Sequence, residues 1–432
     1  MVTNNMRFNS LDNWLDWQTS FHPKAIELGL ERVSKVAAQM ELLQPKHTVI
    51  TVAGTNGKGS SVAMLEAMLL EAGHKVGAYT SPHMHRYNER IRVAGADVSD
   101  DWIIDAFDHI DRARGDTSLS YFEFGTLAGL WIFEQQCVDI ALLEVGLGGR
   151  LDAVNILDAD LALITSIGID HTEWLGEGRD RISLEKAGVA RQDQLLVVSE
   201  PDPPEVMKAF LQQLGSRYFQ LGKDFDFALA EGEWSWWFDK YHFKALPDPG
   251  LLGKHQHQNA AGAIAISQLL PKALRPREAT VRTALQKVHL AGRYERLDPN
   301  STPVDFEVIL DVAHNPDGTQ MLAHLLAGDK IPGKTYVLFG VMQDKDAKVM
   351  LKALASIADV WLLSAAHTER AMEVSSLHRL LKETLPEAKG LVAADIAEAW
   401  QMAKSRLTAQ DRLVVTGSFY TVAEMCRLAI TL

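Results

Sequence analysis

Apolar residues along this chain form short runs that alternate with longer stretches of helix-like spacing. Between residue 48 and about residue 200, runs rich in Val, Ile and Leu are separated by segments in which apolar positions recur every three or four residues. Buried strands that alternate with helices are typical of a parallel sheet. The pattern predicts strands at 49–52, 75–80, 139–145, 161–167 and 195–199.

The pattern changes after residue 217 and again near residue 290. Aromatic residues at 233–238 and 241–243 predict antiparallel hairpin strands, and Asn259 is expected to open an Ala-rich helix over 260–270. Turn-forming residues then mark a linker, after which strand and helix patterns resume. The second set of strands is expected at 307–312, 335–341, 360–364, 390–393 and 412–416.

A glycine-rich loop follows the first strongly apolar strand. Gly57 and Lys58 lie at its centre, and good helix formers follow as far as Gly73. Backbone amides at glycines and at a helix N-terminus bind phosphate, lysine neutralises it, and a hydroxyl can ligate the accompanying Mg²⁺. The loop therefore predicts a nucleoside triphosphate site, with contacts from Thr55, Asn56, Gly57, Lys58, Gly59 and Ser60.

The spacing of this loop departs from the pattern G-x-x-x-x-G-K-[ST]. Val52 stands where that pattern has its first glycine, and Gly59 stands where it has a hydroxyl. A strand–helix turn with an unrelated lysine is the alternative, and the position after the first buried strand disfavours it. The fold class expected is α/β. Residues 1–292 form a P-loop-type parallel-sheet ATPase domain with a small antiparallel hairpin region, 293–303 a linker, and 304–432 a smaller Rossmann-like domain.

Polar residues follow neighbouring strands of the expected sheet, where ligands bind in open parallel sheets. These are Ser81, Glu144 and His171, and their oxygen and nitrogen donors suit a divalent cation that is also held by phosphate. Ser81 could instead start a Ser-Pro turn, Asp170 could cap a helix with Glu173, and His171 could serve packing alone. Glu144 should be buried and must then have a partner.

Composition bounds the function only loosely. A length of 432 residues suggests two or three domains, and no apolar run reaches the length of a membrane span. The net charge of −13 argues against nucleic-acid binding, and the N-terminus shows no apolar leader, so a cytoplasmic enzyme is expected. Cys137 and Cys426 are expected to be buried thiols, and Lys186 an exposed helix lysine.

The motifs together resemble the folylpolyglutamate synthase family, within the Mur-ligase-like group of ATP-dependent amide ligases. The resemblance runs from about residue 28 to 420 and is most specific at 144–155. It rests on the segments 54–60, 81–83, 144–155, 170–172, 185–188, 292–293 and 311–316. The chain is most similar to the bifunctional bacterial branch, which glutamylates dihydropteroate as well as reduced folates.

The resemblance implies a role for many of these residues. It implies ATP and Mg²⁺ as cofactors, with K⁺ as a further candidate, and it implies that CO₂ carbamylates Lys186. Lys58, Lys186 and His171 are the implied catalytic residues, Ser81, Glu144 and His171 the Mg²⁺ ligands, and Asn259, Arg293 and Asp311 further ATP contacts. The implied acceptor-binding residues are Leu28, Gly29, Leu30, Tyr121, Phe122, Glu123, Leu151, Asp152 and Ala153.

The implied reaction joins the amine of L-glutamate to a pteroate or folate carboxylate through an acyl phosphate. Partners are expected to be small molecules only, with no nucleic acid and no membrane, and the protein is expected to be a monomer. A Mur-type cell-wall ligase is the first alternative, which the segment 144–155 disfavours. A P-loop switch NTPase is the second, and the compact loop and the segment 311–316 disfavour it.

Overall fold

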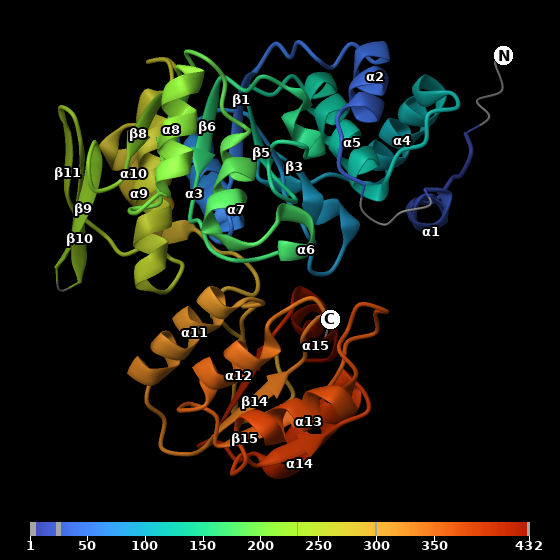
Figure 1. Cartoon of the computed structure of the whole chain (residues 1–432), viewed down its shortest axis with the longest axis vertical. Coiled ribbons are helices and arrows are strands. Elements are labelled where there is room, and N and C mark those ends of the chain that lie inside the picture. Colours follow the sequence, from blue (N-terminus) through green and yellow to red (C-terminus); the bar gives the residue numbers. More distant parts are fainter. Residues whose placement is uncertain (1–5, 23–26, 231, 299, 430–432) are drawn as a thin grey trace. The chain divides into compact units, whose positions relative to one another are not determined.

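We describe the protein from a computed structural model that covers residues 6–22, 27–230, 232–298 and 300–429. The chain divides into two compact units (Figure 1). The first comprises 1–167, 178–250 and 256–288, and the second comprises 168–177, 251–255 and 289–432. Residues 1–5, at the start of the expected leader-free N-terminus, and Pro299 of the expected linker lie outside the described residues.

An eight-stranded sheet forms the centre of the first unit, in the order β4-β3-β2-β5-β1-β6-β7-β8. At one edge β3 pairs antiparallel with β2, and β4 pairs antiparallel with β3. The remaining pairs are parallel. The strands are β1 (Thr48–Ala53), β2 (Val76–Tyr79), β3 (Ile91–Val93), β4 (Ala96–Asp97), β5 (Ile140–Glu144), β6 (Leu161–Ile164), β7 (Leu195–Val198) and β8 (Arg217–Gln220).

The five strands expected in this sheet are confirmed. Strand β8 (Arg217–Gln220), which the sequence pattern did not predict, pairs with β7 in parallel. The short edge strands β3 and β4 contain no apolar run, so the sequence did not reveal them. Burial explains the difference, because β5 is wholly buried and β1 is buried except at Thr48, whereas the edge strand β8 is partly exposed.

Helices and two 3-10 turns pack around this sheet (Figure 1). They are α1 (Leu11–Phe21), α2 (Glu31–Gln39), α3 (Lys58–Glu71), η1 (Tyr87–Arg90), α4 (Asp100–Arg114), α5 (Tyr121–Gln135), η2 (Ala153–Ile156), α7 (Gly178–Ala187), α8 (Glu205–Leu214), α9 (Lys254–Leu269) and α10 (Glu278–Lys287). Helix α5 begins with a capping box, in which Ser120 and Glu123 each accept the other's backbone N–H. Helix α9 begins at Lys254, so Asn259 lies in its second turn and does not open it.

A separate three-stranded antiparallel sheet comprises β9 (Phe225–Ala230), β10 (Glu233–Phe238) and β11 (Tyr241–Leu246). The expected hairpin is thereby confirmed, with one further strand. Alternate residues of β10, namely Trp234, Trp236 and Phe238, are buried, as a two-residue period requires when one face is covered. Trp236 donates its indole N–H to Ala261 O in α9, which ties this sheet to the first unit.

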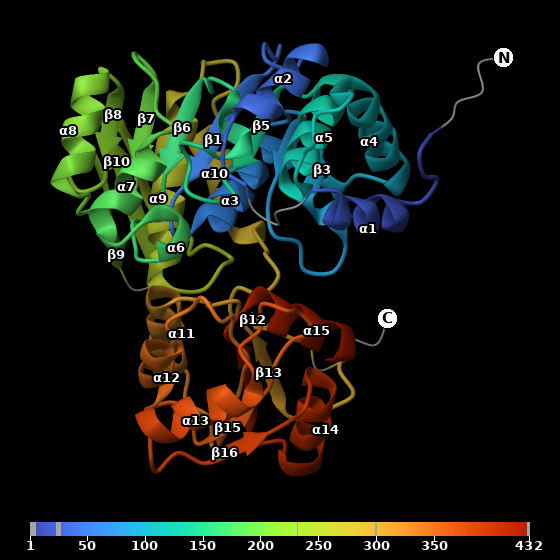
Figure 2. The same cartoon turned by 45° about the vertical axis from the view of Figure 1, so that its right-hand side comes forward.

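The second unit contains a six-stranded sheet in the order β12-β13-β17-β14-β15-β16. All pairs are parallel except β12 with β13. The elements are α6 (Thr172–Leu175), β12 (Glu295–Arg296), β13 (Glu307–Leu310), α11 (Pro316–Gly328), β14 (Thr335–Phe339), α12 (Ala347–Leu354), β15 (Val360–Leu363), α13 (Val374–Thr384), β16 (Gly390–Val392), α14 (Ile396–Arg406), β17 (Arg412–Thr416) and α15 (Phe419–Ala429). Helix α11 packs beside α12, and α14 beside α15 (Figure 2).

The five strands expected in this half of the chain are confirmed. Their core contains fully buried residues such as Phe339, Trp361 and Leu377. Cys426 is buried as expected, whereas Cys137 is exposed, because it follows the end of α5 in a left-handed turn with φ of 47°. None of the described helices combines the length and the apolarity needed to cross a bilayer.

Candidate active site

The glycine-rich loop joins β1 to α3 and is held in place by residues that follow β6. Thr55 N–H donates to Ser166 O at 2.7 Å, and Asn56 O accepts from Thr165 Oγ1 at 2.7 Å. A side chain at Gly54 could not fit, because an added Cβ would lie 1.8 Å from Thr165 Oγ1. Two neighbouring strand ends therefore hold the loop in place, and α3 begins at Lys58 with its first amides beside the loop.

Asn259 lies against this loop from α9. Gly57 has a left-handed φ of 87°, and a Cβ there would lie 2.2 Å from Asn259 Oδ1. The Asn259 side chain is buried and donates to Gln256 Oε1 at 2.9 Å. The structure thus brings Asn259 and the loop, which are about 200 residues apart in sequence, into direct contact.

Two lysines converge on one carbonyl of the loop. Lys58 Nζ donates to Gly54 O at 3.0 Å, and Lys186 Nζ donates to the same oxygen at 2.9 Å. Lys186 is only 4% exposed, so the expectation of an exposed helix lysine is wrong. It lies on the buried face of α7 with Ile182 and Ser183, and the packing of that face decides its position. The two cations give the loop a positive potential suited to phosphate.

The ends of β2 and β5 bring Ser81 and Glu144 together. Glu144 is 5% exposed at the last position of β5, and its Oε2 accepts the Ser81 N–H at 3.0 Å. The partner that a buried carboxylate requires is therefore present. Both residues offer oxygen atoms, which are the donors that Mg²⁺ prefers.

The segments expected to bind the acceptor lie together in the first unit. Gly29 N–H donates to Leu151 O at 3.3 Å, and the Phe122 ring lies where a Cβ on Gly146 would stand, 2.6 Å from Cζ. Asp152 is buried and accepts the N–H groups of Leu147 and Val154. Burial raises the pKa of Asp152 to about 6, although these amides and the charge of Lys58 oppose the rise.

Asp311 and Arg293 are adjacent in the second unit. The Asp311 carboxylate accepts the backbone N–H of Tyr294 at 2.9 Å and that of Ala313 at 2.8 Å. Burial raises the pKa of Asp311, and the nearby charge of Arg293 opposes that rise most strongly. The Arg293 guanidinium lies 5.2 Å from the centre of the Phe419 ring.

Asp170 is the centre of a charged cluster in the second unit. Its carboxylate lies 2.5 Å from Lys345 Nζ, 3.1 Å from Asn315 Nδ2 and 3.3 Å from His314 Nε2. Burial alone would raise the pKa of Asp170, but the bond and charge of His314, followed by His171 and Lys345, hold it far below the ordinary value. The alternative in which Asp170 caps α6 with Glu173 is wrong, because His171 occupies the N-cap with φ of 51°.

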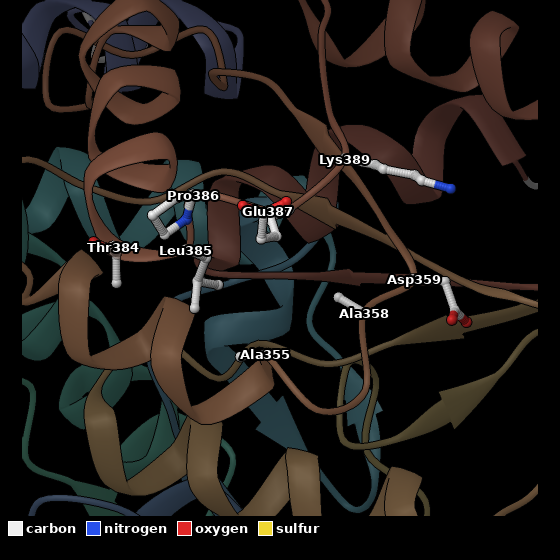
Figure 3. A pocket seen from close by; sticks show the side chains of 9 residues that line it. Ala355, Ala358, Asp359, Thr384, Leu385, Pro386, Glu387 and Lys389 are labelled. Atoms are coloured by element: carbon white, nitrogen blue, oxygen red, sulfur yellow. The ribbon is translucent and has the colours of Figure 1, made fainter.

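A hollow of about 520 Å³ opens on the second unit at the starts of β15 and β16 (Figure 3). Asp359, Thr384, Glu387 and Lys389 contribute its polar side chains. None of the predicted site residues lines it, so it is separate from the candidate active site.

Comparisons with known proteins cover nearly the whole chain. The family model "Mur ligase, glutamate ligase domain" matches residues 292–419. The dihydrofolate synthase/folylpolyglutamate synthase of Escherichia coli K12 is 38% identical over 417 residues, which cover 96% of this chain and 94% of that protein. The chain belongs to the dihydrofolate synthase/folylpolyglutamate synthase family. The relative from Haemophilus influenzae is 37% identical and covers 98% of both chains.

Solved structures of this family have the same fold as the chain. E. coli FolC in complex with DHPP and ADP aligns with a TM-score of 0.90, 37% identity and 97% coverage of both chains. A bifunctional folylpolyglutamate synthase/dihydrofolate synthase with Mn, AMPPNP and L-glutamate bound aligns with a TM-score of 0.88, 38% identity and 99% coverage of both chains. The expected resemblance to the folylpolyglutamate synthase family is confirmed.

The residues of this family member that sequence reasoning missed lie in its charged cluster. Lys345 and Asn315 are buried or nearly so and bind Asp170, but they follow it by 175 and 145 residues. The sequence offers one signal, since a lysine between two aspartates in Asp344-Lys345-Asp346 follows an expected strand end. Asn315 lies within the segment 311–316, and the sequence alone assigns it no separate role.

Proposed function

We propose that this family member ligates L-glutamate to dihydropteroate and to reduced folates at the expense of ATP. The observation that carries the proposal is the convergence of Lys58, Lys186 and Asn259 on the rigid loop after β1. That arrangement suits a triphosphate, and the family relatives were solved with ADP, AMPPNP, DHPP and L-glutamate.

The chemistry needs an activated carboxylate, because a free carboxylate resists attack by an amine. The acceptor carboxylate takes the γ-phosphoryl group of ATP, which forms an acyl phosphate and releases ADP. The amine of glutamate then attacks the carbonyl carbon, loses a proton and expels phosphate as the amide forms. Lys58 and the amides of the loop stabilise the charge that develops during phosphoryl transfer.

Mg²⁺ fits the donors that the chain offers. Ser81 and Glu144 lie together and provide oxygen atoms, and His171 is the third proposed ligand. When bound, the ion neutralises phosphate charge and polarises the transferring group. Solved relatives that contain Mn ion support a divalent metal in this family.

The proposal includes three further features that follow from the family resemblance. Carbamylation of the Lys186 amine by CO₂ would replace a buried ammonium beside the loop with a carboxylate. K⁺ serves as an additional cofactor. The enzyme acts as a monomer in the cytoplasm, without a membrane or nucleic-acid partner.

Phosphate release by the full-length enzyme tests the function. With ATP, Mg²⁺ and L-glutamate present, we expect phosphate release on addition of either dihydropteroate or a reduced folate, and little release without an acceptor. A response to one acceptor alone would reduce the function to that half. Release that requires a nucleotide-linked peptide would indicate a cell-wall ligase, and release without glutamate would indicate a switch NTPase.

A further inference from the structure

Tyr294 follows Arg293 directly and has an unusual backbone conformation. Its φ is 48°, in the left-handed region, although it is not glycine. This conformation is unfavourable for a residue with a side chain, because its Cβ comes too close to the following carbonyl oxygen. Such residues persist only where their surroundings hold them, and they concentrate at functional sites.

Three contacts hold Tyr294 in this conformation. Its backbone N–H donates to Asp311 Oδ2 at 2.9 Å, and its hydroxyl donates to Asp329 Oδ2 at 2.8 Å. Its ring is 5% exposed and belongs to the core of the second unit, with Ile309 and Leu322. The residue is therefore fixed at its backbone, along its ring and at its hydroxyl.

The hydroxyl contact is itself rigidly held. Asp329 also binds the Arg412 guanidinium at 3.1 Å, and Arg412 is 2% exposed. Burial, followed by the bond to Asp329, raises the pKa of Tyr294. The phenol therefore stays protonated at neutral pH and remains a donor to Asp329.

Asp311 links Tyr294 to Arg293. The Asp311 carboxylate accepts the Tyr294 N–H and lies near the charge of Arg293. The Arg293 guanidinium lies over the ring of Phe419. If Tyr294 left the left-handed region, the peptide between residues 293 and 294 would rotate. The Arg293 side chain would then leave the backbone in another direction.

We propose that Tyr294 is a positioning residue that fixes the direction of the Arg293 side chain and thereby sets the affinity for ATP. The inference rests on the proposed role of Arg293 as a nucleotide contact. It adds a residue that touches no substrate and acts through its neighbour. A purely structural residue of the same core would stabilise the fold without affecting ATP in particular.

The experiment compares full-length Tyr294→Ala, Tyr294→Phe, Arg293→Ala, the double variant Arg293→Ala/Tyr294→Ala and the control Leu377→Ala. Leu377 is fully buried in the same core, but it lies in α13, which packs on β15 and β16. The measurements are the KM for ATP, the KM for glutamate, the melting temperature, and AMPPNP binding by calorimetry. Calorimetry reports on the nucleotide site whether or not the enzyme turns over.

We expect Tyr294→Ala to raise the KM for ATP and the Kd for AMPPNP about tenfold, with the KM for glutamate nearly unchanged. Tyr294→Phe keeps the ring and the backbone bond, so its affinity should stay close to that of the wild type. Leu377→Ala should lower the melting temperature without weakening AMPPNP binding. The double variant should bind AMPPNP no more weakly than Arg293→Ala alone, because Tyr294 acts through Arg293.

Two results would overturn the inference. One is an AMPPNP affinity of Tyr294→Ala equal to that of Leu377→Ala. The other is a double variant whose Kd for AMPPNP rises by the product of the two single-variant factors. An Arg293→Ala variant with unchanged AMPPNP affinity would remove the role of Arg293, and the role of Tyr294 with it. A wild-type enzyme that binds AMPPNP but releases no phosphate with glutamate and acceptor would contradict the proposed function alone.

Discussion

Asp170 and Lys345 form a buried ion pair, with 2.5 Å between Oδ1 and Nζ. Their side chains are 7% and 6% exposed, and Asn315 and His314 surround the same carboxylate. Asp170 thus joins the segment 168–177 to the loop after β14 through Lys345 and to the loop after β13 through Asn315 and His314. This cluster organises the polar edge of that unit.

Removal of the Asp170 carboxylate should destabilise the protein strongly. Asp170→Ala removes the nearer carboxylate from the buried Lys345 ammonium and leaves it the Asp344 carboxylate at 3.1 Å, so we expect a loss of about 3 kcal/mol of unfolding free energy. Urea unfolding of the full-length protein measures this. Glu205→Ala, which breaks an exposed pair with Lys208, is the control and should leave stability unchanged. An equal effect of the two substitutions would show that the buried pair contributes nothing.

Lys58→Ala should abolish ligation and preserve the fold. Lys58 is the first residue of α3, and its ammonium donates to the backbone carbonyls of Gly54 and Thr55. We expect kcat to fall by at least about a thousandfold, since such electrostatic groups act on the transition state. Circular dichroism and the melting temperature should match those of the wild type. Lys58→Arg is the charge-preserving control, and near-normal turnover of Lys58→Ala would contradict the assigned role.

Gly57→Ala should weaken nucleotide binding, whereas Gly73→Ala should not. Both glycines flank α3 with nearly equal φ, 87° and 90°, so a Cβ strains the two backbones alike. Only at Gly57 would that Cβ also meet Asn259, at 2.2 Å, whereas nothing lies within 4 Å at Gly73. AMPPNP binding by calorimetry should weaken about tenfold or more in Gly57→Ala alone. Equal binding by the two variants would exclude the Asn259 contact as the cause.

Asp152 should give acceptor binding a pH dependence centred near 6. Burial raises the pKa of this carboxyl to about 6, so it is ionised at pH 7 and protonated at pH 5. If the ionised form binds the acceptor, the KM for dihydropteroate rises as pH falls through 6. Asp152→Asn should have a KM raised about tenfold at pH 7 and no such pH dependence. The KM for ATP is the internal control, and an unchanged pH profile in the variant would refute this role.

The same raised pKa fixes the sign of its effect on stability. Between about pH 4 and pH 6 the folded protein binds this proton more readily than the unfolded chain does. The contribution of Asp152 to stability therefore falls as pH rises through this window. The wild type should therefore lose free energy of unfolding between pH 5 and pH 7, and Asp152→Asn should lack this loss. The difference in unfolding free energy, variant minus wild type, should be more positive at pH 7 than at pH 5, and urea unfolding at the two pH values measures it.

Much of the architecture was predictable from the sequence because its signals are local. The runs at 49–52 and 335–341 are apolar enough to be central strands, and the structure has strands there. The loop around Lys58 is contiguous, so its chemistry is visible without the fold. The expectation that Glu144 is buried and partnered followed from a carboxylate inside an apolar run, and Ser81 N–H is that partner.

Other features depended on which face of an element packs inward. Lys186 was expected to be exposed, but it lies on the buried face of α7 and donates to Gly54 O. Cys137 was expected to be buried, but the turn in which it lies leaves it exposed. Spacing within one helix cannot reveal these positions, because they depend on what covers each face. Strand β8 likewise joined the main sheet through a pairing with β7 that its own residues do not specify.

The sequence by itself determined the order of the apolar strands, the phosphate loop and the family. Only the tertiary structure decided that Asn259 lies against Gly57, that Lys345 neutralises Asp170, and that Tyr294 is held in a left-handed conformation. The physical reason is that hydrogen bonds and charges act over a few ångströms of space. Their partners here are separated by up to about 200 residues of chain, so folding alone brings them together.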